Sequence, residues 1–240
     1  MDFRNKGVVI TGGSKGLGRA LATELGKRGA RLVLIARDQD RVEQAAEELK
    51  REGVEAHALA ADVASKDSIY PLAGAAQALL GRVDVVIHAA SALGASPLRP
   101  LADTDCEDLE HALQVNLVGP FRLTKALLGP MALHGEGLVV HVSSDAAVEG
   151  YPTWGAYGVS KAAFDHLARI WGAEMSAFGV TFVAVDPGDM DTDLHAEAVP
   201  DADRSELQDP REVAHRLVAW LAEGAIPAGA RVKLQEAVLR

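Results

Sequence analysis

Short apolar runs alternate with longer amphipathic stretches along most of the chain. The apolar runs are rich in β-branched residues and predict buried strands, whereas apolar residues at three- and four-residue spacing predict helices. Strands are expected at 7–11, 31–36, 54–60, 83–90, 137–142, 180–185 and 230–234. Helices are expected from the glycine-rich turn to about residue 28, and over 38–51, 65–81, about 107–133, about 155–178 and 210–223.

Regular alternation of strands and helices predicts an α/β protein with a doubly wound parallel sheet of about seven strands and helices on both faces. We find no internal repeat, linker or second core, so residues 1–240 are expected to form a single domain. The segment at about 189–208 is polar and irregular in sequence, which favours a mobile lid over a substrate.

A glycine-rich turn follows the first strand. It begins after Thr11 and contains Gly12, Ser14, Lys15, Gly16, Leu17 and Gly18. Glycines in a strand-to-helix turn let the backbone approach a ligand closely, and a helix N-terminus favours phosphate. Although the spacing is not Gly-x-Gly-x-x-Gly, the turn predicts a nucleotide site.

The end of the second strand bears on the type of nucleotide. An acidic residue at this point bonds the ribose hydroxyls in many NAD-binding folds, but Arg37 occupies the position here. Arg37 and Lys15 could bind a 2′-phosphate, which favours NADP(H) over NAD(H), or they could be ordinary surface cations. After the third strand, Asp62 could accept from an adenine amino group with Val63 adding a backbone contact, or Asp62 could be a cap.

Residues 143–161 carry the candidate chemistry. Tyr157 and Lys161 lie four apart, so they share one face of a helix, while Ser143 and Ser144 lie at the end of a strand. A tyrosine has a reference pKa of about 10, and a nearby ammonium lowers it. The pair could therefore exchange a proton with a substrate oxygen. The alternative is a packed ring beside a solvated charge.

Three other polar residues need an explanation. Asn116 lies within an apolar helical stretch, so its side chain either bonds a neighbouring carbonyl or has a role in the site. His88, in the fourth strand, is expected to be a core histidine with its hydrogen bonds satisfied. Thr192, which follows Pro187 and Gly188, could bond a cofactor amide or phosphate.

Composition excludes several classes of function. The net charge of −10 argues against a nucleic-acid surface and gives no positive patch for anionic lipid. One cysteine, Cys106, allows neither an intrachain disulfide nor a cysteine-rich metal site, and no metal is expected. No run of 18 apolar residues and no signal peptide are present, so we expect a cytoplasmic protein without a membrane span.

These motifs together resemble the classical short-chain dehydrogenase/reductase family, in its NADP(H)-preferring form, over nearly the whole chain. The matching positions are Thr11, Gly12, Gly16 and Gly18 in the turn, Asn116, Ser144, Tyr157 and Lys161 in the catalytic set, and Pro187, Gly188 and Thr192 near the end. Each motif alone is weak, whereas five in the right order are specific.

The resemblance implies a Rossmann-like fold and a mechanism. Tyr157 would give a proton to a carbonyl or take one from an alcohol, and Ser144 would hold the same oxygen. Lys161 would lower the pKa of Tyr157 and bind the nicotinamide ribose, and Asn116 would hold a water that links Lys161 to solvent. Hydride would move between nicotinamide C4 and the substrate carbon.

Two departures from the family pattern matter. The sequence His88-Ala89-Ala90-Ser91 replaces the usual Asn-Asn-Ala-Gly, so any cofactor contact of Ala89 must come from its backbone. The family's usual glycine pair near the C-terminus is missing, so a homodimer is as plausible as a homotetramer.

The sequence therefore predicts an NADP(H)-dependent oxidoreductase that acts on a carbonyl or alcohol of a largely apolar small molecule. The predicted substrate contacts are Ala146, Tyr151, Trp154, Met190 and Leu194. A 3-oxoacyl-carrier reductase of fatty-acid or polyketide synthesis is an alternative activity. A protein that binds NADP(H) as a sensor or scaffold without turnover is the alternative from another class.

Overall fold

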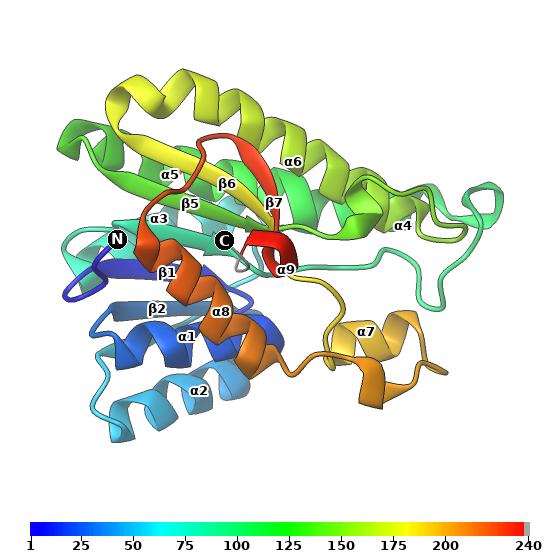
Figure 1. Ribbon diagram of the computed structural model, residues 1–240, viewed down its shortest axis with the longest axis horizontal. Helices are drawn as coiled ribbons and strands as arrows, with labels where there is room; N and C mark the ends of the chain where they lie inside the picture. The colour runs from blue at the N-terminus through cyan, green and yellow to red at the C-terminus, as the bar shows by residue number, and fades with distance from the viewer. Residues whose placement is uncertain (238–240) are drawn as a thin grey trace.

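The computed structural model describes residues 1–237, which contain a seven-stranded, entirely parallel sheet (Figure 1). The strands are β1 (Gly7–Thr11), β2 (Arg31–Ala36), β3 (Ala56–Ala60), β4 (Val85–His88), β5 (Gly137–Val142), β6 (Val180–Asp186) and β7 (Ala230–Lys233). Their order in the sheet is β3-β2-β1-β4-β5-β6-β7. The predicted single Rossmann-like sheet with seven strands is confirmed.

Helices cover both faces of the sheet (Figure 1). One face carries α1 (Gly16–Lys27), α2 (Gln39–Arg51) and α8 (Pro210–Glu223). The other carries α3 (Lys66–Leu80), α5 (Gly119–His134) and α6 (Gly155–Met175). The remaining helices are α4 (Cys106–Leu113), α7 (Asp193–Ala198) and α9 (Leu234–Ala237).

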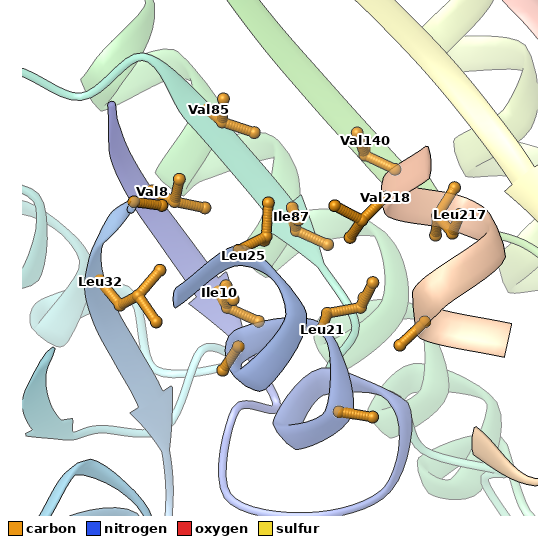
Figure 2. Close-up of a cluster of buried hydrophobic side chains, with 14 of the residues drawn as sticks. Val8, Ile10, Leu21, Leu25, Leu32, Val85, Ile87, Val140, Leu217 and Val218 are labelled. Atoms are coloured by element: carbon orange, nitrogen blue, oxygen red, sulfur yellow. The ribbon is translucent and has the colours of Figure 1, made fainter. Parts of the chain in front are cut away.

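Burial on both faces explains why the strands read as continuous apolar runs. Figure 2 shows Val8 and Ile10 of β1 and Ile87 of β4 beside Leu21 and Leu25 of α1, and none of these five side chains is exposed to solvent. Each such side chain stabilises the fold by roughly 1.5–3 kcal/mol through its transfer out of water. Helix α1 begins directly after the glycine turn, so this core fixes its N-terminus beside the sheet.

The long helix expected at about 107–133 is divided into three parts. Helix α4 ends at Leu113, a π-helical turn runs from Gln114 to Val118, and α5 begins at Gly119. Pro120 lies in the first turn of α5 and has no N–H for the Asn116 carbonyl four residues earlier, which favours a break here, whereas Pro130 lies inside α5 without interrupting it. The wider turn places Asn116 at the irregular point, and such turns are frequent at functional sites.

The segment at about 189–208 is more ordered than its sequence predicts. It contains α7, a short 3-10 turn at Arg204–Glu206, and a parallel bridge between Met190 and Gln208. Thr192 caps α7 by accepting a hydrogen bond from the His195 amide at 3.3 Å. The expectation of irregular structure is therefore wrong in part, while movement of this segment stays a prediction. Within residues 1–237, no helix combines the length and apolar character needed to cross a bilayer.

Candidate active site

Two adjoining cavities lie at the carboxyl ends of the strands. The larger, of about 480 Å³, is lined by Ser144, Tyr157 and Lys161, and the smaller, of about 370 Å³, by the glycine turn and the end of β2. Both include residues Lys15 and Ala89. Neighbouring strands β1 and β4 mark the point where the strand order reverses, which is where ligands bind in open parallel sheets.

The glycine turn has the geometry of a close backbone approach. Gly12 and Gly16 have positive φ angles of 72° and 54°, which side chains other than glycine rarely adopt. A Cβ on Gly18 would lie 2.2 Å from the Gly12 carbonyl oxygen, so the helix can begin this close to β1 only with glycine there. Lys15 is the N-cap residue of α1 and gives it no side-chain hydrogen bond. The helix N-terminus therefore keeps donors for an anion.

Most residues predicted to bind a cofactor line the two cavities. The larger includes Lys15, Gly16, Leu17, Gly18, Ala89, Tyr157, Lys161, Pro187, Gly188 and Thr192, and the smaller includes Gly12, Ser14, Lys15, Arg37, Asp62, Val63 and Ala89. Thr11 lines neither, because it is buried and its Oγ1 accepts from the Ala90 amide at 3.3 Å. Asp62 accepts from the Ala64 amide at 2.9 Å, as a loop cap would, and still faces the smaller cavity.

The two predicted phosphate-binding cations have different surroundings. Arg37 is exposed in the smaller cavity and forms no ion pair with residues 1–237. Lys15 is paired with Asp193 of α7, with 2.8 Å between its Nζ and Oδ2. The sequence interpretation missed Arg41, which lines the same cavity one turn into α2 and pairs with Asp38 at 3.1 Å. Its place near the start of the helix that follows Arg37 was the signal that could have found it.

The two serines after β5 have separate roles. Ser143 is buried, and its hydroxyl donates to Asp165 Oδ2 at 2.7 Å. Ser144 faces the larger cavity, and its hydroxyl donates to Asp145 Oδ1 at 3.0 Å. Both serines line the larger cavity, but the Ser143 hydroxyl is bonded to the buried side of the site at Asp165, so Ser144 is the better placed to meet a ligand.

Tyr157 and Lys161 lie on one face of α6 within the larger cavity. Lys161 is 2% exposed, and its Nζ donates to the Val142 carbonyl oxygen at 2.8 Å and lies 5.5 Å from the Tyr157 ring centroid. Burial lowers the pKa of Lys161 to about 8, while the Asp165 carboxylate opposes this change. The lysine is thus mainly charged at neutral pH.

The sequence predicted that Lys161 lowers the pKa of Tyr157, but in the structure the pKa of Tyr157 is raised. Burial raises the pKa of Tyr157 to about 12, and this outweighs the opposing effects of the Ser144 and Ser91 hydroxyls. The ring is 7% exposed, so the free-energy penalty of removing its phenolate from water is larger than the stabilisation that the neighbouring hydroxyls give the phenolate. The phenol is consequently protonated at neutral pH.

Asn116 connects the π-helical turn to the loop after β4. Its Oδ1 accepts from the Ala92 amide at 2.8 Å and from the Ser91 hydroxyl at 3.2 Å. Its Nδ2 donates to the Ala92 carbonyl and to Ser160 Oγ, each at 2.8 Å. The side chain lines neither cavity and bonds protein groups with both of its polar atoms. It therefore fixes the loop that carries Ser91 against α6.

His88 is a core histidine, as expected, but the expectation that its hydrogen bonds are satisfied is wrong for Nδ1, which is buried without a partner among residues 1–237. It is 1% exposed, and its Nε2 is 2.8 Å from Thr124 Oγ1. Burial, with a smaller contribution from the Lys161 charge, lowers the pKa of His88 to about 3. The ring is neutral in the folded protein across the physiological range.

Replacing His88 with Asn should make folding less sensitive to acid. Below the unfolded pKa of about 6.5, the unfolded chain binds a proton that folded His88 refuses, so stability falls as pH falls towards about 3. Between pH 7 and pH 5, the free energy of unfolding should fall by roughly 2 kcal/mol less in His88→Asn than in the wild type. Urea unfolding at both pH values measures this difference. The exposed control His166→Asn should keep the wild-type loss, and an unchanged pH dependence in His88→Asn would contradict the assignment.

A partly buried arginine that the sequence interpretation missed, with 14% of its side chain exposed, connects the segments around the site. Arg231 of β7 donates through Nε to Asp165 Oδ2 at 3.2 Å, and through Nη2 to Asp186 Oδ2 and the Ser144 carbonyl, both at 2.8 Å. Asp165 lies one turn after Lys161 on α6, and Asp186 ends β6. One cation therefore binds the ends of β5 and β6 and the helix that carries Tyr157.

The predicted substrate contacts all line the larger cavity: Ala146, Tyr151, Trp154, Met190 and Leu194. Trp154 packs edge-on against Tyr157 with 5.6 Å between ring centroids, and Leu93 and Leu194 belong to the same apolar cluster. This wall is largely apolar, which suits the largely apolar substrate expected from the sequence. The exception is Asp145, whose carboxylate also faces the cavity.

Comparison with known proteins agrees with this geometry. The family profile of short chain dehydrogenases matches residues 6–203, so the chain belongs to the short chain dehydrogenase family. It is 35% identical over 198 residues to a short chain dehydrogenase from Pseudocercospora fijiensis, a match that covers 81% of this chain and spans only 63% of that relative's length. It is 31% identical over 207 residues to the 3-oxoacyl-[acyl-carrier-protein] reductase FabG of Pseudomonas aeruginosa, covering 86% of this chain and 82% of FabG.

A solved structure gives the same result for the fold. A short chain dehydrogenase from Shigella flexneri, complexed with NADP, superposes with a TM-score of 0.90 at 26% identity. The superposition covers 98% of this chain and 99% of the other. The chain therefore belongs to the short chain dehydrogenase family by both sequence and fold.

Proposed function

We propose that the protein is an NADP(H)-dependent reductase of small-molecule carbonyl compounds. The observation that carries the proposal is that Tyr157 lines one cavity with Ser144 and Lys161, and that this cavity continues to the glycine turn. A proton donor, a second hydroxyl and a nucleotide-sized cavity meet at one edge of the sheet. These are the groups that carbonyl reduction needs.

Each catalytic side chain has a separate task in this proposal. Tyr157 donates its proton to the carbonyl oxygen, and Ser144 positions that oxygen. The charged Nζ of Lys161 lies 5.5 Å from the centroid of the Tyr157 ring and stabilises the phenolate that forms. A bound nicotinamide supplies the hydride.

The protonation state of Tyr157 favours reduction. A phenol with a pKa of about 12 carries its proton at neutral pH and is ready to donate it. Alcohol oxidation would instead begin with a phenolate, which burial disfavours. At neutral pH the phenol is therefore already in the protonation state from which carbonyl reduction begins.

The residues of the smaller cavity fit NADP(H). Gly16 leaves open space, since a Cβ built there meets nothing closer than 3.5 Å, and the adjoining helix N-terminus suits a pyrophosphate. Arg37 lies at the end of β2, in the position where NAD-binding folds carry a carboxylate. The NADP bound to the Shigella flexneri relative agrees with this choice.

Replacing Arg37 with Asp should reverse the cofactor preference. The change removes the cation proposed to bind the 2′-phosphate and adds a carboxylate that can accept from ribose hydroxyls. We expect the ratio of kcat/KM for NADPH to that for NADH to fall at least about tenfold, which corresponds to about 1.4 kcal/mol. Steady-state kinetics with both cofactors measures the ratio. The control Arg28→Asp lies at the far end of α1, and an equal change there, or none in Arg37→Asp, would refute the assignment.

A 3-oxoacyl-carrier reductase is the second candidate, because FabG of Pseudomonas aeruginosa matches over most of both chains. Screening the purified protein for NADPH oxidation against ketones, diketones and acyl thioesters distinguishes the possibilities. The proposal predicts turnover of small ketones, whereas preference for acyl thioesters would favour the second candidate. Tight NADPH binding without any turnover would favour the sensor or scaffold.

A further inference from the structure

A carboxylate without a cationic partner lies directly beside the proposed catalytic serine. Asp145 Oδ1 accepts from the Ser144 hydroxyl at 3.0 Å and from the Ala146 amide at 2.8 Å, and Oδ2 accepts from the Tyr151 hydroxyl at 2.8 Å. No lysine, arginine or histidine in the described part of the chain comes within 4.0 Å of it. These hydrogen bonds fix the position of Asp145 and leave its charge uncompensated.

Most other carboxylates of the same cavity are neutralised by a partner. The pairs are Asp186 with Arg231 at 2.8 Å, Asp191 with Arg204 at 2.6 Å and Asp193 with Lys15 at 2.8 Å. Asp189 also lines the cavity and forms no such pair within residues 1–237. The cavity wall also contains Lys161, which is 2% exposed and is bonded to a backbone carbonyl, and Lys15, which is the partner of Asp193. The substrate side of the cavity is therefore electronegative, which attracts cations and repels anions.

One aromatic residue contacts this carboxylate, and two more line the same cavity. Tyr151 is 45% exposed and is held by its hydroxyl bond to Asp145, and Trp154 packs edge-on against Tyr157 with an interplanar angle of 68°. All three rings line the cavity. Aromatic faces next to a carboxylate favour an alkylammonium group, because both the ring quadrupole and the carboxylate attract its charge. A neutral hydroxyl could form a charge-assisted hydrogen bond to Asp145, whereas an ammonium would gain the direct attraction of opposite charges as well.

We propose that the substrate is an amino ketone, whose protonated amine binds between Asp145 and the rings of Tyr151 and Trp154 while its carbonyl oxygen meets Ser144 and Tyr157. The carbonyl part of this inference rests on the proposed function, whereas binding of the amine does not. Because Asp145 is bonded to Ser144, the amine must lie within a few bonds of the reacting carbon. Carrier-bound acyl chains lack such a group and do not use this feature of the cavity.

Binding of a matched pair of non-reacting probes tests the amine site. We expect calorimetry on the NADPH complex at pH 7 to show benzylammonium binding at least about tenfold more tightly than benzyl alcohol. Asp145→Asn should remove this preference, and Asp145→Glu, which keeps the charge, should retain part of it. Glu174→Gln removes one charge from the exposed far end of α6, about 25 Å from Tyr157 along the helix, and should keep the preference. Equal affinity of the two probes in the wild type, or a preference that survives in Asp145→Asn, would overturn the inference.

Turnover separates this inference from the proposed function. Aminoacetone carries a protonated amine where hydroxyacetone carries a neutral hydroxyl. The inference therefore predicts a higher kcat/KM for aminoacetone in the wild type. This difference in kcat/KM should be lost in Asp145→Asn. Equal turnover of both ketones would contradict the amino-ketone proposal and would still support the reductase function. An Asp145-dependent preference for benzylammonium without turnover of any ketone would remove the reductase and leave the cation site.

Discussion

Tyr157→Phe is expected to lower kcat for carbonyl reduction at least about 10²-fold, the usual contribution of a general acid. The variant keeps the ring that packs against Trp154 and loses only the hydroxyl, so the cavity wall and NADPH binding should be preserved. Stopped-flow measurement of NADPH oxidation gives the rate, and fluorescence titration gives the cofactor Kd.

Tyr70→Phe is the matched control for this change. Tyr70 lies on α3 and is 73% exposed, so loss of its hydroxyl should alter neither the rate nor the Kd. If Tyr157→Phe retained the wild-type kcat, proton donation would have to be assigned to another group. A parallel loss of NADPH binding would instead make the phenol a cofactor contact.

Arg231→Gln should reduce the free energy of unfolding by about 3–5 kcal/mol, the usual cost of removing one partner of a buried ion pair. The substitution leaves the Asp165 and Asp186 carboxylates buried without their cation, and both are within 3.2 Å of Arg231 in the wild type. Urea unfolding monitored by circular dichroism measures the loss. Because the arginine also binds the Ser144 carbonyl, the remaining folded protein should show a lower kcat.

Arg4→Gln provides the contrast for the stability measurement. Arg4 and Asp2 form a pair at 2.7 Å whose side chains are largely exposed, and exposed pairs contribute about 0–1 kcal/mol. A loss in Arg231→Gln no larger than that in Arg4→Gln would mean that the buried pair does not hold these segments together.

Local patterns were sufficient to predict most of the fold. The bounds of β1, β2 and β5 agree with the sequence prediction, because each is a continuous apolar run that ends at glycine or a polar residue. Helix α8 begins where Asp209 caps it and Pro210 fits its first position. In such segments the local signals and the tertiary structure agree.

Features that depend on distant contacts could not be predicted in the same way. The π-helical turn forms where Gly119 packs against the Val63 carbonyl, since a Cβ on Gly119 would lie 2.2 Å from that oxygen. The network of Arg231 joins residues 45 to 87 positions away along the chain. The pKa of Tyr157 likewise depends on burial rather than on its spacing from Lys161.

Transfer of isotope from NADPH to product tests the central claim most directly. The protein is mixed in a single turnover with NADPH deuterated at nicotinamide C4 and with the best ketone from the screen, and the product is analysed by mass spectrometry. The account predicts one deuterium on the carbinol carbon and a rate that falls at least about 10²-fold in Tyr157→Phe. NADPH that binds but transfers no deuterium to any ketone, or transfers it equally fast in Tyr157→Phe, would contradict it.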